Sequence, residues 1–306
     1  MIKIYPSVKK KEGKEILYEI RRDYGGVFRD FYDTLKAYEH INWDFFFYKL
    51  NDIDIVLVDE GKKFSNKGAL AKYALLSNKM YIKAKSFKSA IMHEVLHLSS
   101  CVVTKKCLYL GFLQVDRESG SIIGIGLNEG YTNLLDKRYF PDYDEDKGKD
   151  LRYTYMVTTS IANLLEHFVG KESMEKWYFS ADLNSLINYL SDYVPREECI
   201  CFLLAIDNVF NFLDNGCVKH PLRAAWSYRY IINFMGRCYM NLYIEEYYNK
   251  FYGKEELKER LLAVYELMEN RLKFTKLKIP LTKKISKEDF HAYVKYEKNN
   301  VLKKCS

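Results

Sequence analysis

The sequence lacks the long apolar segments that mark membrane proteins. No stretch of about 18 consecutive apolar residues occurs, which is the least that a membrane-spanning helix needs. The most apolar run, residues 200–213, is interrupted by Asp207, Asn208 and Asn211. The first twenty residues carry charges throughout and do not have the pattern of a secretory signal. We therefore expect no membrane segment and a cytoplasmic protein.

The sequence also lacks a disulfide framework. Its seven cysteines include no C-x-x-C pair, and only Cys199 and Cys201 lie close together. An odd number of scattered cysteines is typical of free thiols in a reducing compartment.

The body of the chain has no net positive charge. The net charge of +7 is accounted for between Lys273 and Lys304, which hold ten lysines against three acidic residues. The remainder has as many acidic as basic residues, so it lacks the basic surface of a nucleic-acid groove. Only the basic C-terminal tail offers a contact for a nucleic acid or an acidic partner.

The most informative stretch is SFKSAIMHEVLHLSSCVV, residues 86–103. An apolar body without proline or glycine predicts a helix, with Ser86 as its N-cap. Helical spacing puts His93 and His97 on one face, four residues apart, and brings Glu94 to the same side. Two imidazole ligands beside a carboxylate that can take a proton from water are what a zinc hydrolase needs.

A third ligand is predicted downstream, in GLNEGYTNLL at 126–135. The apolar spacing of this segment predicts a second helix with Glu129 in its first turn. Glu129 can complete a His2Glu site that leaves a fourth position for water. Gly130 would let this helix approach the histidine helix closely, and Asn128 and Asn133 can orient the ligands.

Other interpretations of these residues stay open. The two histidines can be ordinary core or surface residues, and Glu129 can serve only to favour the helix dipole. Asp116 and Glu118 are alternative third ligands, although they fall at the tip of a predicted turn.

HEVLH at 93–97 followed by NEG at 128–130 resembles the zincin-like metallopeptidases of the gluzincin type. The resemblance is strongest over residues 79–140. It implies zinc (Zn2+) bound by His93, His97 and Glu129, with Glu94 as the general base. The related metzincin pattern would need glycine and histidine where this chain has Ser100 and Val103. Gluzincins often add a tyrosine or histidine that stabilises the oxyanion; the candidates here are Tyr153, Tyr155, His167, His220 and Arg223.

We predict an α+β, zincin-like fold. A mixed N-terminal sheet is expected from strands at 1–5, 53–58 and 79–85, of which Lys79–Lys85 is the candidate edge strand for binding an extended peptide. A β-hairpin is expected from strands at 108–115 and 121–125 around DRESG. Helices are expected at 14–22, 151–169, 172–179, 183–193, 197–213, 221–248 and 255–272.

The predicted division has three parts. Residues 1–126 form an α/β part with the HExxH helix and the hairpin, residues 127–275 form an α-helical part with the third ligand, and residues 276–306 form the basic tail. The function expected is a zinc metallopeptidase acting on a protein or peptide. The alternative is a non-enzymatic interaction module on the same scaffold, with structural zinc or none.

Overall fold

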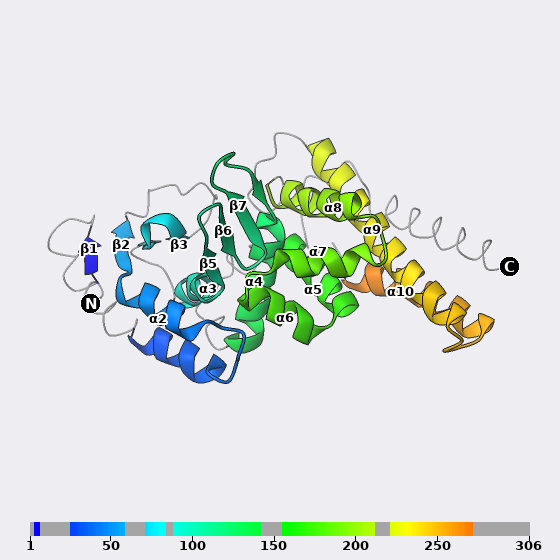
Figure 1. Ribbon diagram of the computed structural model, residues 1–306, viewed down its shortest axis with the longest axis horizontal. Coiled ribbons are helices and arrows are strands. Elements are labelled where there is room, and N and C mark those ends of the chain that lie inside the picture. Colours follow the sequence, from blue (N-terminus) through cyan, green and yellow to red (C-terminus); the bar gives the residue numbers. More distant parts are fainter. Residues whose placement is uncertain are drawn as a thin grey trace. The chain divides into compact units, whose positions relative to one another are not determined.

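A computed structural model describes residues 3–6, 25–58, 71–83, 88–141, 155–211 and 221–271. These residues form a mixed α+β structure that is mostly helical, with two small sheets (Figure 1). The expected α+β class is therefore confirmed. Among the described residues, no helix combines the length and the low polarity needed to cross a lipid bilayer.

The chain groups into two compact units. The first contains residues 1–122, 131–156 and 175–183, and the second contains residues 123–130, 157–174 and 184–306. The sequence boundaries near residues 126 and 275 stay predictions, and the basic tail lies outside the described residues.

The first unit contains a four-stranded sheet in the order β1-β2-β4-β3. The strands are β1 (Lys3–Pro6), β2 (Asp54–Val58), β3 (Ala71–Ala74) and β4 (Lys79–Lys83). β1, β2 and β4 run parallel, whereas β3 pairs antiparallel with β4, so that Tyr73 lies opposite Met80. Alternation along β4 buries Met80 and Ile82, which explains why this strand was recognisable in the sequence.

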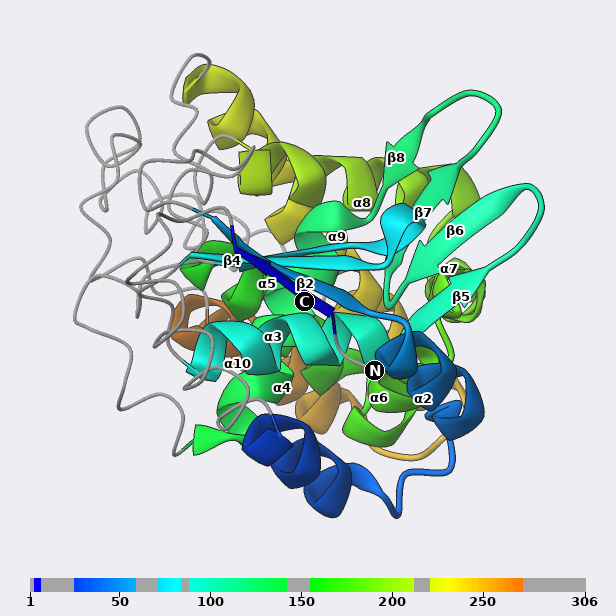
Figure 2. The ribbon, with the colours of Figure 1, turned by 90° about the vertical axis from the view of Figure 1, so that its left-hand side faces the viewer.

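The prediction that Lys79–Lys85 forms the edge strand is wrong. β4 lies inside the sheet between β2 and β3, and the edge strands among the described residues are β1 and β3. β3 has only four residues, AKYA, which is too short for a period-two pattern to stand out. The sheet lies over α3 (Lys88–Ser99), and β3 packs against this helix (Figure 2).

Aromatic side chains pack around the helices that precede the sheet. Residues 25–35 are helical, and α2 spans Trp43–Asn51, with Asn42 accepting the amide of Phe45 as N-cap. The Phe31 ring stacks on Phe46 at 5.4 Å and on Phe140 at 5.8 Å. The aromatic residues of this segment therefore build a core.

α3 is shorter than the helix expected at 86–103. It ends at Ser99, and residues 101–103 form strand β5 (Cys101–Val103). The hydroxyls of Ser99 and Ser100 bond back to the Leu96 carbonyl, which terminates the helix locally. The predicted N-cap Ser86 lies outside the described residues.

The strands expected on either side of DRESG are neighbours in a larger, four-stranded sheet in the order β5-β6-β7-β8, in which β5, β6 and β7 pair antiparallel. The single strand expected at 108–115 is two strands, β6 (Cys107–Leu110) and β7 (Leu113–Asp116), joined by a two-residue turn at Gly111, whose φ is 55°. The strand expected at 121–125 is only β8 (Ile122–Ile123), because α4 (Ile125–Tyr139) begins directly after it.

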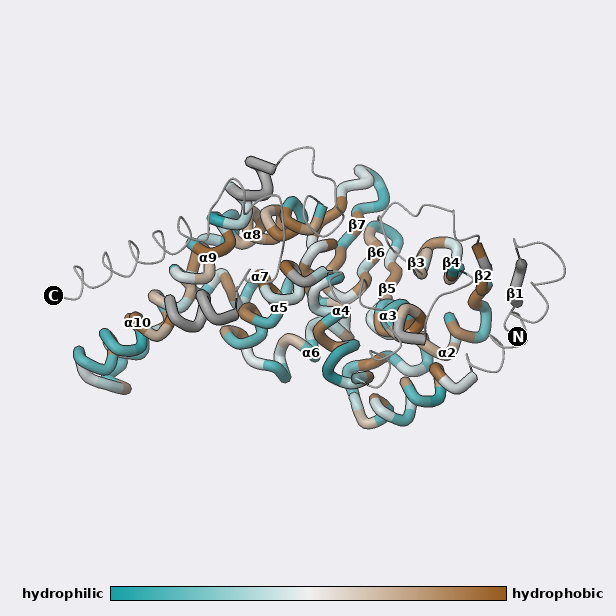
Figure 3. Tube along the Cα trace, turned by 180° about the vertical axis from the view of Figure 1, so that it is seen from behind, coloured by the Kyte–Doolittle hydropathy of each residue, from teal (hydrophilic) through white to brown (hydrophobic). Residues whose placement is uncertain are grey.

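The second unit is built from helices. Its helices occupy most of the ranges expected from the sequence: α5 (Met156–Val169), α7 (Leu183–Ser191), α8 (Arg196–Val209), α9 (Pro221–Tyr248) and α10 (Lys254–Arg271). The helix α6 (Lys171–Phe179) also follows its expected range. α9 packs on both α8 and α10. Figure 3 shows hydrophobic residues along α8 and the adjoining part of α9. The helix expected at 14–22 lies outside the described residues.

Candidate metal centre

The two histidines of the HExxH pattern lie on one face of α3, four residues apart. Their ring centroids are 4.8 Å apart. Val95, Leu96 and Leu98 are fully buried, so the hydrophobic sides of the helix fix its orientation. His97 is 4% exposed and His93 is half-buried. One imidazole is therefore held inside the protein, while the other keeps access to solvent.

Glu129 lies in α4, in the second turn and not in the first turn as predicted, because the helix begins two residues earlier than the sequence indicated. Its neighbour Gly130 allows a close approach, but to α5 and not to the histidine helix. A Cβ at Gly130 would lie 2.4 Å from the Thr158 carbonyl oxygen. Any other residue at this position would push the helix carrying Glu129 away from α5.

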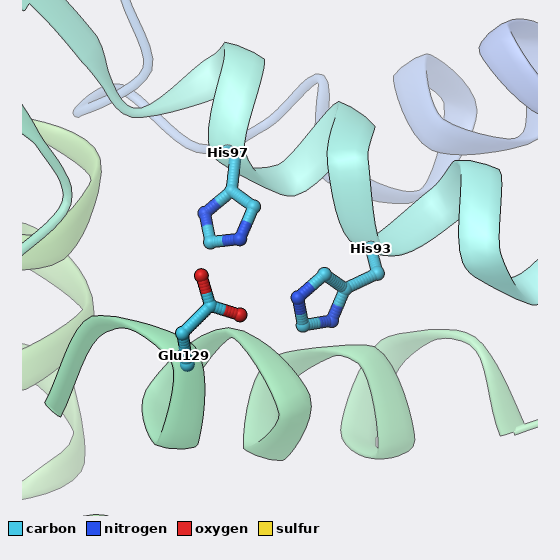
Figure 4. Close-up of side chains that lie close together, drawn as sticks. All are labelled: His93, His97 and Glu129. Carbon is cyan, nitrogen blue, oxygen red and sulfur yellow. The ribbon is translucent and has the colours of Figure 1, made fainter. Parts of the chain in front are cut away.

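His93, His97 and Glu129 converge. One potential ligand atom from each lies within 4.8 Å of the others, and this is the one such group of three among the described residues. In Figure 4 each imidazole turns a nitrogen toward the Glu129 carboxylate. The three residues singled out from the sequence as metal ligands are thus brought together.

The donor set fits zinc better than it fits magnesium or calcium. Two imidazoles and one carboxylate are typical zinc ligands, whereas magnesium and calcium prefer sites made of oxygen alone. Zinc bonds of about 2.0–2.2 Å in a tetrahedral site place two donors about 3.4 Å from each other. A set already within 4.8 Å needs only a small side-chain rotation to close on the ion.

Glu94 follows His93 on α3 and is buried, with 9% of its surface exposed. Its Oε2 accepts a 2.6 Å hydrogen bond from the backbone N–H of Tyr73 on the edge strand β3. This hydrogen bond fixes the orientation of the Glu94 side chain.

The His97 ring contacts a side-chain hydroxyl through Nδ1. Its Nδ1 lies 3.4 Å from Oγ1 of Thr132, and this hydroxyl is 2.7 Å from the hydroxyl of Tyr178. With Nδ1–H donating to Thr132, the Nε2 lone pair of His97 is available to a metal.

The alternative ligands Asp116 and Glu118 are not part of the group. Oδ1 of Asp116 accepts hydrogen bonds from the amides of Glu118 and Ser119 and from the Ser119 hydroxyl. These bonds close the turn after β7 and lower the pKa of Asp116. Asp116 therefore serves the turn, and Glu118 is exposed.

Of the five candidates for oxyanion stabilisation, Tyr155 lies next to a ligand. Its ring is stacked near His93, with 6.0 Å between the centroids, and its φ of 60° places it in the left-handed region just before α5. His167 instead uses Nδ1 to bond the Tyr239 hydroxyl at 2.8 Å. Tyr153 and His220 lie outside the described residues, and the side chain of Arg223 is not described.

Two contributors were missed in the sequence. Thr132 follows Glu129 by three residues, so helical spacing alone could have placed it on the ligand face. The Tyr73 amide is a backbone group, and no side-chain pattern signals it. The buried Asn128 and Asn133 lie in the same helix, and their predicted role in orienting ligands stays a prediction.

The cysteines take no part in this group. The described ones, Cys101, Cys107, Cys199, Cys201 and Cys238, are free thiols. Burial raises the pKa of Cys101 and of Cys238 to about 12, which makes both thiols poor nucleophiles.

In comparisons with known proteins, no family model matches this sequence, and neither a curated protein nor a solved structure matches it.

Proposed function

We propose that this protein is a zinc-dependent metallopeptidase with a gluzincin-like active site. The observation that carries the proposal is the convergence of His93, His97 and Glu129, with Glu94 next to His93 on the same helix. A mixed sheet with an antiparallel edge strand beside that helix supports a zincin-like arrangement.

Three protein ligands favour a catalytic over a purely structural zinc site. Structural zinc sites close with four protein ligands, whereas catalytic sites use three and keep one position open. Zinc, when bound, supplies Lewis acidity that lowers the pKa of water and polarises a carbonyl group. A structural site would have no use for the buried carboxylate of Glu94.

Glu94 is the proposed general base. It takes the proton of the attacking water and returns it to the leaving amine. The Tyr73 amide fixes the position of the Glu94 side chain before the reaction. Because Glu94 is buried, proton transfer takes place away from bulk solvent.

The substrate proposed is an extended segment of protein or peptide. β3 is an edge strand, so it has main-chain groups that face away from β4. The Tyr73 amide is one of these groups, since it points to Glu94. The amide of Ala71, two residues earlier, also faces away from β4. A peptide that pairs with this edge would pass directly beside the general base.

Tyr155 is the proposed oxyanion donor. Its hydroxyl is an O–H donor, and its ring already lies beside His93. A donor at this place can stabilise the negative charge that develops on the carbonyl oxygen of the scissile bond.

The test is a proteolysis assay on an unfolded, fluorescently labelled protein mixture. Wild type is expected to cleave it, to lose activity with a chelator and to regain it with zinc. Glu94→Gln is expected to bind zinc as wild type does and to cleave nothing, because the introduced amide oxygen can still accept the Tyr73 amide but cannot take a proton. Glu118→Gln, in the exposed turn, is the matched control. Equal activity in Glu94→Gln and wild type would refute the proposal.

A further inference from the structure

The N-cap residue of the helix that carries Glu129 has no side chain with which to cap it. The carbonyl oxygen of Gly124 accepts the amide of Asn128 at 2.9 Å, so Gly124 is the N-cap of α4. Its φ of 83° suits glycine. Gly124 has no side chain to accept the free amides of the first turn, which N-cap residues normally do.

Asp207 of α8 supplies the missing acceptor. Its Oδ2 accepts the Gly124 amide and its Oδ1 accepts the Gly126 amide, both at 2.8 Å. The two bonds occupy both carboxylate oxygens, and the negative charge lies at the positive end of the α4 dipole. Asp207 is 8% exposed, so this cap is a buried one provided by a residue 81 positions further along the chain.

The first two turns of α4 pack so closely against neighbouring helices that a Cβ would not fit at Gly126 or Gly130. A Cβ at Gly126 would lie 2.7 Å from the Ile206 carbonyl oxygen, immediately before Asp207. One turn later, a Cβ at Gly130 would lie 2.4 Å from the Thr158 carbonyl oxygen. Glu129 lies between these two glycines, in a segment that touches α8 on one side and α5 on the other.

We propose that Asp207 is a positioning residue of the metal centre, which sets the start of α4 and thereby the place of Glu129 relative to the ion. The inference rests on the proposed metal centre. Glu129 follows Gly126 by three residues, less than one helical turn, so a shift of the capped turn moves the ligand with it. A serine or asparagine at position 124 would cap the helix without a buried charge. Burying a charge, as Asp207 does, is costly. The carboxylate from α8 adds what a local cap cannot, because it ties the first turn to a second helix.

The direct test is the zinc affinity of the full chain, measured by competition with a chromophoric chelator. Asp207→Asn keeps one acceptor oxygen but turns an NH2 group toward the other amide. Zinc binding should weaken about tenfold, as is common when a group that orients a ligand is lost. Asp192→Asn, an exposed residue after α7, is the matched control and should bind zinc as wild type does. An unchanged affinity in Asp207→Asn would overturn the inference.

A double-mutant cycle separates positioning from general stability. If Asp207 acts through Glu129, then Asp207→Asn should not weaken the residual zinc binding of Glu129→Ala. The same tenfold loss in both backgrounds would mean that Asp207 stabilises the fold without positioning the ligand, and would contradict the proposal.

Amide exchange on the wild type tests the same coupling without any variant, should Asp207→Asn fail to fold. Coupling between two sites is reciprocal, so zinc should slow exchange of the Gly124 and Gly126 amides and leave those of α10 unchanged. Exchange at the two glycines that does not respond to bound zinc would refute the positioning role. A wild type that binds no zinc would refute the metal centre itself, which is a different outcome.

Discussion

Nδ1 of His97 faces the hydroxyl of Thr132, three residues beyond Glu129 on the neighbouring helix, at 3.4 Å. The hydroxyl is in turn 2.7 Å from that of Tyr178, so the ring is held by a short polar chain inside the protein. With Nδ1–H of His97 donating to Thr132, Nε2 is the nitrogen that can bind a metal.

Thr132→Val is expected to weaken zinc binding about tenfold, because the isosteric side chain fills the space but cannot accept Nδ1–H. Thr132→Ser keeps the hydroxyl and should restore an affinity near that of the wild type. A chelator competition assay measures both. Equal affinities in the two variants would show that the hydroxyl does not orient His97.

Tyr155→Phe is expected to lower kcat by about 10²–10³ with little change in zinc affinity. The change removes one hydrogen-bond donor for the developing oxyanion and keeps the ring beside His93. Steady-state kinetics on a peptide cleaved by the wild type measures this. Tyr189→Phe, on α7, is the control for loss of a tyrosine hydroxyl. A rise in KM with kcat unchanged would assign Tyr155 to substrate binding instead.

Gly130→Ala is expected to lower the free energy of unfolding by about 1–3 kcal/mol, because its Cβ would lie 2.4 Å from the Thr158 carbonyl oxygen. Gly26→Ala is the matched control, since it lies in the helix at 25–35 with nothing within 4 Å of a Cβ. Alanine there should be neutral or slightly stabilising. Urea unfolding compares the two, and equal midpoints would contradict the close packing of α4 on α5.

The raised pKa of Asp207 is expected to make the free energy of unfolding depend on pH. Burial raises the pKa of Asp207 from 3.8 to about 6, against the amides of Gly126 and Gly124, which lower it. A folded pKa above the unfolded one means that the folded state binds the proton more tightly. The contribution of Asp207 to stability is therefore fully present below pH 3.8 and is lost as the pH rises through about 6.

The matched comparison for this pH dependence is Asp207→Asn, which cannot ionise. Between pH 4 and 7 the wild type should lose stability relative to this variant, by up to about 3 kcal/mol for a pKa change of this size. Urea unfolding across this pH range measures the difference. A difference that stays constant would show that Asp207 has the same pKa in the folded and unfolded chain.

The sequence predicted the local features well. α9 begins at Pro221 and ends at Tyr248 as expected, because proline suits the first helical turn. The shared face of His93 and His97 was predicted because it depends on helical spacing alone, whereas Glu129 was singled out by the NEG motif on a second helix.

The features that were missed depend on contacts distant in the sequence or on very short elements. The edge strand AKYA has too few residues to show a period, and the turn at Gly111 divides a run that looked continuous. The Tyr73 amide and the Asp207 cap join segments 21 and 81 residues apart, which no local pattern records. Asp207 did leave one trace, as a charge inside the most apolar run of the chain.

The most direct test of the account is the metal content of the purified protein, with the coordinating atoms identified by X-ray absorption. We predict one zinc ion per chain, bound by two imidazole nitrogens and a carboxylate oxygen, with the oxygen signal lost in Glu129→Ala and binding abolished in the double variant of His93→Ala and His97→Ala. A wild type that takes up no zinc, or a bound zinc whose coordination is the same in all these variants, would contradict it.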